Sequence, residues 1–148
     1  MAVIWLNEAK RKFIVEDGIL LQYVGSDSIV RIPRTVDAIE NDAFEGCKSM
    51  KQLTIPGTVT YIGSGAFYGC TGLTRVKIPH SVKEIGAGCF AGCKSLKEMI
   101  IPGGVDEIGY RALAGCPNLT VYCIENSTAH IYCKENNIHV QTLPYYAI

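Results

Sequence analysis

Cysteine and histidine gather near the C-terminus of this chain, where these residue types could bind a metal ion or form a nucleophile–base pair. Cys123, His130, Cys133 and His139 are spaced Cys-x6-His-x2-Cys-x5-His. Thiolate and imidazole are zinc ligands, but this spacing is not a recognised zinc pattern. His130 and Cys133 would share one face of a helix, whereas Cys123 falls in a strand-like segment. We interpret the four residues as packing residues of a C-terminal cap and expect no metal ion.

Two other kinds of catalytic or cofactor site are also disfavoured. A Cys–His nucleophile needs an orienting carboxylate and an oxyanion hole, and no motif places these groups together. The glycine pairs of Gly63-Ser64-Gly65 and Gly103-Gly104 fall at the corners of repeated segments, and neither opens a helix after a strand with a lysine. They are interpreted as turn glycines and not as a phosphate-binding loop. The sequence thus predicts no enzyme and no cofactor, and a Cys-dependent enzyme is the least favoured alternative.

The elements that must position these side chains are repeats of 23 residues. Two dipeptides recur with this step: Ile-Pro at Ile32, Ile55, Ile78 and Ile101, and Gly-Cys at Gly46, Gly69, Gly92 and Gly115. A fixed period of this length is typical of a solenoid, in which a coil buries its apolar face only by stacking on its neighbours.

Apolar residues alternate with polar ones before each Ile-Pro and predict one short strand per repeat. These strands, at 29–32, 52–55, 75–78, 98–101 and 121–124, should align into a parallel sheet. A second apolar pair, such as Val59 and Ile62, follows in a bent or extended return segment. A short helical turn then precedes Gly-Cys, and its Phe44, Phe67 and Phe90 should stack in a file that Leu113 ends.

Four of the seven cysteines occupy one position of the repeat, at Cys47, Cys70, Cys93 and Cys116. At the spacing of neighbouring parallel strands they would form a file of small apolar core residues. Disulfides between adjacent coils remain sterically open, but the odd total and the regular spacing favour reduced thiols.

Irregular segments flank the repeats and are predicted to cap them. Residues 13–28 read as an N-terminal β-hairpin with Asp17-Gly18 in its turn. Residues 122–142 form a C-terminal capping repeat, with Ser127 capping a helix to about Asn136, Asn137 in a left-handed conformation, and a last strand at 138–140. With four repeats in 29–121, residues 1–148 are predicted to form a single domain.

The repeat also carries a resemblance to a known family. Ile-Pro-x-x-Val-x-x-Ile-Gly-x-x-Ala-Phe-x-Gly-Cys-x-x-Leu, nearly intact from Ile55 to Leu73, resembles the BspA-type leucine-rich repeat, as do the flanks at 17–25 and 122–138. The match spans about residues 13–142. Members are commonly bacterial surface or secreted proteins, so the resemblance implies a leucine-rich repeat solenoid that binds protein partners without enzymatic activity. It implies no particular ligand.

Charge and hydropathy narrow the partners further. Lys plus Arg equals Asp plus Glu, at 14 each, so no net field attracts nucleic acid or an anionic membrane surface. The apolar run Met1–Leu6 is too short for a signal-peptide core or a membrane span. The compartment stays open, because the resemblance implies the cell surface, whereas the missing export signal and the thiol-rich core are compatible with the cytoplasm.

The positions between the core residues of each strand are free to vary and are the candidate binding surface. They are Arg31, Gln52, Thr54, Arg75, Lys77, Glu98, Ile100, Val121 and Cys123, with Arg34, Tyr61, Tyr68 and His80 as secondary candidates at the corners. We predict that this face recognises a protein or peptide partner. Two alternatives remain: an ordinary solvated sheet face, and a structural spacer of a larger surface protein with no ligand of its own.

Overall fold

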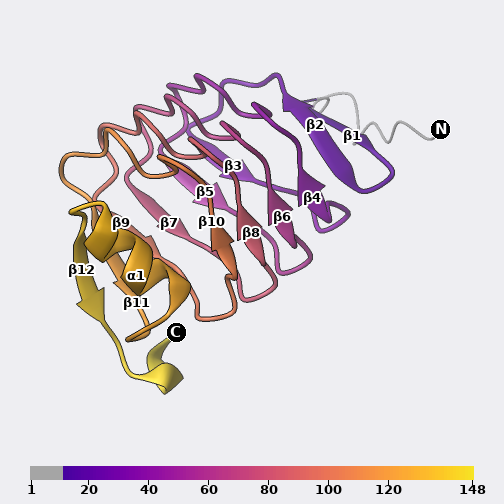
Figure 1. Ribbon diagram of the computed structural model, residues 1–148. Coiled ribbons are helices and arrows are strands. Elements are labelled where there is room, and N and C mark those ends of the chain that lie inside the picture. Colours follow the sequence, from indigo (N-terminus) through magenta and orange to yellow (C-terminus); the bar gives the residue numbers. More distant parts are fainter. Residues whose placement is uncertain (1–11) are drawn as a thin grey trace.

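The computed structural model describes residues 12–148. The apolar run at the start of the chain, and the prediction that it is neither a signal peptide nor a membrane span, lie outside the described residues. Within 12–148 the chain winds as a solenoid whose coils stack from the N-terminal hairpin to a C-terminal helix (Figure 1). The predicted leucine-rich repeat solenoid with a cap at each end is confirmed.

Each coil contributes one strand to each of two sheets. Sheet A has the order β1-β2-β4-β6-β8-β10, and sheet B the order β12-β11-β9-β7-β5-β3. Apart from the antiparallel β1–β2 pair, all neighbouring strands are parallel. The strands of sheet A are β1 (Phe13–Glu16), β2 (Ile19–Tyr23), β4 (Ala38–Ile39), β6 (Tyr61–Ile62), β8 (Glu84–Ile85) and β10 (Glu107–Ile108); those of sheet B are β3 (Ile29–Arg31), β5 (Gln52–Thr54), β7 (Arg75–Lys77), β9 (Glu98–Ile100), β11 (Thr120–Cys123) and β12 (His139–Thr142).

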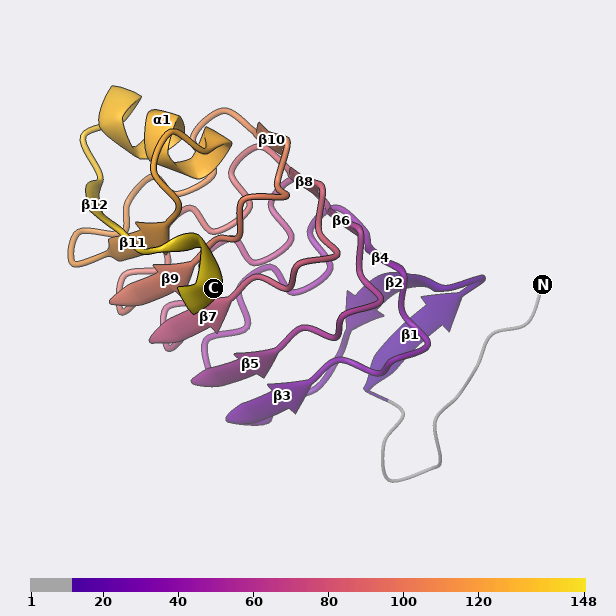
Figure 2. The same ribbon diagram turned by 90° about the horizontal axis from the view of Figure 1, so that it is seen from below.

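Sheet B is the predicted sheet, and its first four strands begin where the sequence analysis placed them. Sheet A was not predicted as a sheet, because a two-residue strand has too little alternation to be recognised in a sequence. Figure 2 shows the two sheets on different sides of the solenoid, with the turns of the coils completing the circuit.

The Ile-Pro pair turns the chain from sheet B towards sheet A. Proline has no amide hydrogen and therefore ends the ladder of each strand without leaving a donor unpaired. Its carbonyl instead accepts a hydrogen bond from the valine three residues later, as between Pro56 O and Val59 N at 3.2 Å and between Pro79 O and Val82 N at 3.1 Å. This closed turn explains the spacing Ile-Pro-x-x-Val.

The Ile-Gly pair after sheet A marks the closest approach of neighbouring coils. A Cβ atom built on Gly86 would lie 2.4 Å from the backbone nitrogen of Ser64, and one on Gly109 would lie 2.3 Å from that of Ala87. Only glycine fits there once another coil lies beneath it. In the first coil, where only the hairpin precedes, the same position is Glu40.

The expected helical turns are single turns closed by bonds between residues three apart, such as Phe67 O to Cys70 N at 3.2 Å. The amide of Phe67 is thereby available to the next coil and donates to Cys89 O at 2.8 Å. The predicted ring file is confirmed: Phe44 and Phe67 stack with centroids 4.9 Å apart, and Phe67 and Phe90 with centroids 5.0 Å apart. Tyr23 extends the file at the N-terminal end, 5.2 Å from Phe44.

The cysteine file lies beside the phenylalanine file and is bonded to it. The thiols of Cys70, Cys93 and Cys116 each donate to the carbonyl of the phenylalanine 26 residues earlier, at 3.2 Å in every case. All seven cysteines have free thiols. The repeated cysteine thus has a structural reason, because a small side chain fills the corner and satisfies a buried carbonyl of the preceding coil.

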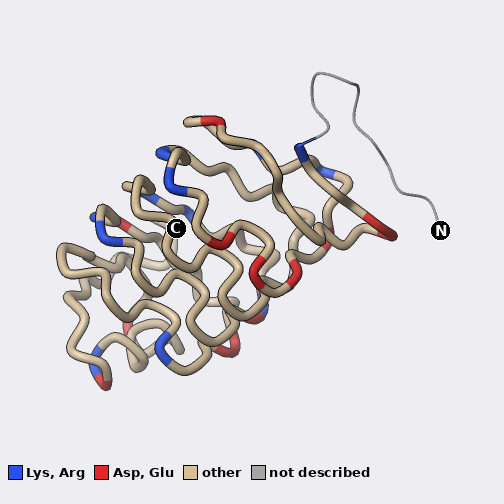
Figure 3. The backbone as a smooth tube through the Cα atoms, turned by 90° about the horizontal axis from the view of Figure 1, so that it is seen from above, with Lys and Arg blue, Asp and Glu red and all other residues tan. Residues whose placement is uncertain are grey.

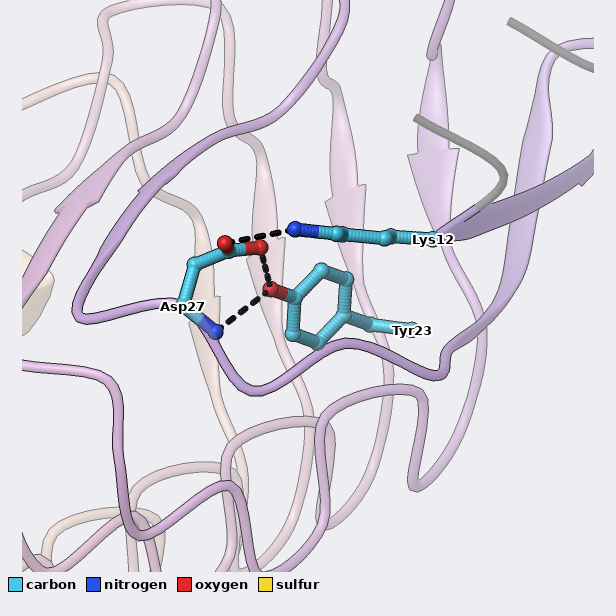
Figure 4. A network of polar contacts seen from close by, with 3 residues as sticks. All are labelled: Lys12, Tyr23 and Asp27. Carbon is cyan, nitrogen blue, oxygen red and sulfur yellow. Dashed lines mark hydrogen bonds and ion pairs between the residues drawn. The ribbon is translucent and has the colours of Figure 1, made fainter. Parts of the chain in front are cut away.

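The N-terminal hairpin closes its end of the stack. Asp17 and Gly18 have φ angles of 47° and 80°, as the predicted hairpin turn requires. Asp27, which follows β2, accepts a hydrogen bond from the Tyr23 hydroxyl at 2.5 Å and forms an ion pair with Lys12 Nζ at 2.6 Å (Figure 4). The hydrogen bond from Lys12 lowers the pKa of the Asp27 carboxyl. Burial, together with the hydrogen bond to Asp27, raises the pKa of the Tyr23 hydroxyl to about 12.

At the other end, α1 (Thr128–Glu135) and β12 cover the last coil, and a 3-10 turn, η2 (Tyr145–Ala147), follows. Ser127 is the N-cap of α1 and accepts a hydrogen bond from His130 N, and Asn137 adopts a φ of 55°, both as predicted. Leu113 ends the phenylalanine file, and its amide donates to the Tyr132 hydroxyl of α1 at 3.4 Å. The predicted division into 13–28, 29–121 and 122–142 within one domain stays a prediction.

One strand differs from the expected pattern. Val121 and Cys123 were placed on the outer face, but both are fully buried, and Thr120 and Tyr122 face outward. In the preceding coil the buried Leu96 and Met99 are three residues apart, whereas in the last coil the buried Leu119 and Val121 are two residues apart. The strand therefore enters the sheet one residue earlier, and Thr120 pairs with Glu98. A shift of one residue turns every side chain of a strand to the opposite face.

Candidate functional site

The four residues that could have bound a metal have separate surroundings. Cys123 is buried in β11, Cys133 is buried on the inner face of α1, and His139 is exposed on β12. His130 is buried, and its Nδ1 accepts a hydrogen bond from Asn126 N at 2.9 Å. Within residues 12–148, no group of three His, Cys, Asp or Glu side chains is placed to hold a metal ion. Cys123, His130 and Cys133 pack within the C-terminal cap, whereas His139 faces solvent.

The cysteines are also unsuited to nucleophilic chemistry. Burial raises the pKa of Cys93 and Cys133 to about 12 and that of Cys116 to about 11. It raises the pKa of Cys123 as well. A reactive cysteine needs a lowered pKa and access to solvent, because the thiolate is the nucleophile. None of these four thiols has a lowered pKa, and Cys93, Cys123 and Cys133 are also buried, whereas Cys116 is partly exposed.

The outer face of sheet B carries the remaining candidates. Arg31, Gln52, Thr54, Arg75 and Lys77 are exposed, and Glu98 and Ile100 are half-buried. The intervening residues Val30, Val76 and Met99 are buried in the core, and Leu53 is half-buried. The structure therefore brings all seven predicted residues onto one surface, which extends over β3, β5, β7 and β9.

This surface is hollowed over its central strands. A depression of about 580 Å³ lies over β5, β7 and β9, and we refer to it as the sheet B groove. The groove is lined by Lys51, Gln52, Leu53, Thr54, Thr74, Arg75, Lys77, Lys97 and Glu98. A second depression of about 510 Å³ shares Leu53, Thr54 and Lys77 with it and reaches His80 and Ser81 at the corner.

The charges of the groove are predominantly positive. Arg75 and Glu98 lie on adjacent strands and form an ion pair, in which Arg75 Nε donates to Glu98 Oε2 at 2.6 Å. Among the residues that the structure describes, no carboxylate pairs with Lys51, Lys77 or Lys97. The groove thus holds four cations and one anion. An extended polypeptide could contact these side chains across three strands.

Lys51, Thr74 and Lys97 line the groove but were not among the predicted site residues. Each directly precedes a strand of sheet B, and they share one position of the 23-residue repeat with Ser28. The shared repeat position was the signal in the sequence that could have identified them. Whether side chains at this position reach the outer face of sheet B depends, however, on the backbone conformation just before each strand.

The secondary candidates do not form one site. His80 lies at the rim of the second depression, and Arg34 is exposed at the corner after β3. Tyr61 was expected at a corner but lies within β6 of sheet A, where it is half-buried. Tyr68 is 51% exposed on the turn side of the solenoid. Neither tyrosine can contribute to the sheet B face.

The fold and the exposed sheet face define a leucine-rich repeat solenoid, a class commonly used for protein interaction. The model of the BspA-type leucine-rich repeat region matches residues 23–137 with six copies, so the chain belongs to this family. No curated protein matches the chain.

Solved bacterial structures share the fold. A leucine-rich cell surface protein of Faecalibacterium prausnitzii is 28% identical, with a TM-score of 0.74 over 85% of this chain and 35% of its own. A leucine-rich repeat protein of Eubacterium ventriosum is 25% identical, with a TM-score of 0.67 over 95% of this chain and 42% of its own. A leucine-rich repeat protein of T. pallidum is 25% identical, with a TM-score of 0.60 over 79% of this chain and 66% of its own.

The chain therefore spans between about a third and two thirds of the length of these structures. In the part of the chain that the structure describes, no helix combines the length and apolar character needed to cross a bilayer.

Proposed function

We propose that this chain is a non-enzymatic binding module that recognises a protein or peptide partner through the outer face of sheet B. One observation carries the proposal: along the strands of sheet B, the outward-facing side chains differ from coil to coil, whereas the inward-facing side chains repeat. The buried positions are constrained by stacking, whereas the outward-facing positions Arg31, Gln52, Thr54, Arg75, Lys77, Glu98 and Ile100 are not. A surface of this kind can acquire specificity without any cost to the fold.

The geometry of the face supports the proposal. The stacked coils hold the strands in fixed register, so the exposed side chains start from a rigid backbone and little order is lost on binding. The sheet B groove provides a concave contact area over β5, β7 and β9. The leucine-rich repeat class and the raised thiol pKa values both favour binding over catalysis.

The alternative is a structural spacer within a longer protein. This alternative is favoured because the chain covers only 35% of the similar Faecalibacterium prausnitzii structure. A spacer would retain no partner, and changes on the sheet B face would affect nothing but solubility. Partner capture therefore distinguishes the two functions.

The test compares three immobilised proteins: the wild type, the double variant Arg75→Glu/Lys77→Glu, and the control Lys83→Glu/Lys134→Glu. All four side chains are exposed, and both variants change the net charge equally. Bacterial and host surface extracts are passed over each, retained proteins are identified by mass spectrometry, and their purified forms are titrated by calorimetry.

We expect at least one purified partner that binds the wild type and the control with similar affinity and the sheet B variant at least about tenfold more weakly. Unchanged binding by the Arg75→Glu/Lys77→Glu variant would remove this face as the binding site. No purified protein binding any of the three would favour the spacer. Circular dichroism of the variants checks that the coils remain folded.

A further inference from the structure

The charges of this neutral chain are separated between the two sheets. Among the described residues in the six strands of sheet B, Glu98 is the only acidic one. The sheet A side instead carries six of the 14 acidic residues of the chain, in its strands or directly beside them: Glu16, Asp37, Glu40, Glu84, Asp106 and Glu107. In Figure 3, Lys and Arg recur on successive coils along the sheet B side.

We infer that the sheet B groove binds an extended acidic segment of another protein, with carboxylates on alternate residues. The inference rests on the proposed function and names the chemistry of the partner. Its carboxylates would be bound by Lys51, Arg75, Lys77 and Lys97.

The spacing of the cations supports this assignment. Arg75 and Lys77 point to the same side of β7 two residues apart, a separation of about 7 Å along a strand. Carboxylates on alternate residues of an extended peptide have the same separation. Lys51 and Lys97 lie on either side, two coils or about 10 Å apart. A peptide lying along β7 would therefore have cations beneath it and on both sides.

The ion pair within the groove shows that the site accommodates a carboxylate. Glu98 contacts the Arg75 guanidinium on the edge formed by Nε and Nη2, and the donors on its other edge stay available to a second carboxylate. Lys51, Lys77 and Lys97 are exposed, so their hydration is displaced only when a partner binds. Carboxylates in the groove would offset the positive charges of Lys51, Lys77 and Lys97, which form no ion pair among the described residues.

The composition of the groove argues against single-stranded nucleic acid as the occupant. Proteins that bind it stack bases on aromatic side chains. None of the residues that line the sheet B groove is aromatic. The half-buried Leu53 and the hydroxyls of Thr54 and Thr74 instead suit contact with a polypeptide.

The experiment uses the whole chain labelled with ¹⁵N and an octapeptide that alternates Glu and Thr, with the matching Gln–Thr peptide as the neutral control. We expect shifts of amide signals confined to β5, β7, β9 and their flanks, and affinity that falls steeply when salt rises from about 20 to 300 mM. The variant Lys77→Gln/Lys97→Gln should bind at least about fivefold more weakly, and Lys83→Gln/Lys134→Gln within about twofold of wild type.

Four results would overturn the inference: equal binding of the neutral peptide, signal shifts spread over the surface, tighter binding of an oligothymidylate of the same length, or self-association that shifts the same amides before peptide is added. The last would assign the groove to the acidic side of a second copy.

These failures differ from failure of the proposed function. If the acidic peptide does not bind but a purified partner is still lost with Arg75→Glu/Lys77→Glu, the face binds by other chemistry and only the present inference falls. If neither measurement responds, both fall.

Discussion

Replacing one phenylalanine of the file by leucine tests whether ring stacking between coils stabilises the solenoid. Phe67 is fully buried between Phe44 and Phe90, with centroid distances of 4.9 and 5.0 Å. Phe90 is equally buried but has one aromatic neighbour in the file, because Leu113 occupies the next coil. The substitution Phe67→Leu therefore removes two stacked pairs, and Phe90→Leu removes one.

The comparison isolates the stacking contribution. Both substitutions remove the same atoms from fully buried sites, so the loss of apolar burial and of packing volume is similar in the two proteins. A stacked pair contributes about 0.5–1.5 kcal/mol beyond area burial. We expect Phe67→Leu to reduce the free energy of unfolding by about 0.5–1.5 kcal/mol more than Phe90→Leu.

The measurement is urea unfolding followed by circular dichroism, with the free energy obtained by linear extrapolation. The double variant Phe67→Leu/Phe90→Leu should show a coupling energy of the same size, since the two rings are in contact. Equal losses in the two single variants, or a larger loss for Phe90→Leu, would refute the argument that stacking along the file stabilises the coils.

Three further predictions concern the coils and caps. Raising the pH from 7.5 to above 10 should destabilise the protein, because burial raises the pKa values of Cys93 and Cys133 to about 12 in the folded state, whereas unfolded thiols titrate near pH 8.5. Each thiol therefore lowers the free energy of unfolding by about 1.4 kcal/mol per pH unit between these two pKa values. Urea midpoints that stay constant over this pH range would contradict the prediction. Gly86→Ala should lower the free energy of unfolding by about 3 kcal/mol, because the new Cβ would lie 2.4 Å from Ser64 N. Gly57 has open space around it, so Gly57→Ala should remain within about 0.5 kcal/mol of wild type in the same urea assay. Ser127→Ala should lower the free energy of unfolding by about 1 kcal/mol, because α1 loses its N-cap, whereas the control Ser49→Ala changes an exposed serine and should have no such effect. Equal hydrogen exchange of the α1 amides in the two variants would show that the cap does not stabilise the helix.

Much of the fold followed from the sequence because its repeat is strict. A step of 23 residues places like residues over like residues, so the strands of sheet B, the phenylalanine file and the cysteine file could all be placed before any coordinates. The caps were recognised from local chemistry, the Asp17-Gly18 turn and the Ser127 N-cap, since these motifs act on their own backbone. The same alternation identified the seven outward-facing residues of the sheet B face.

Other features depended on contacts between coils, which the sequence does not express locally. Sheet A consists of two-residue strands that exist only through pairing with their neighbours. The register of β11 depends on its pairing with β9, in which Thr120 and not Val121 lies opposite Glu98, and this reversed the predicted faces of Val121 and Cys123.

The charge of the chain illustrates the same division. Composition established that the total is neutral, and it suggested no electrostatic field at all. The winding of the chain decided that Lys51, Lys77 and Lys97 lie together on sheet B while six acidic residues lie along sheet A. The sum of the charges is a property of the sequence, whereas their separation arises because the winding of the coils places basic and acidic segments on different sides of the solenoid.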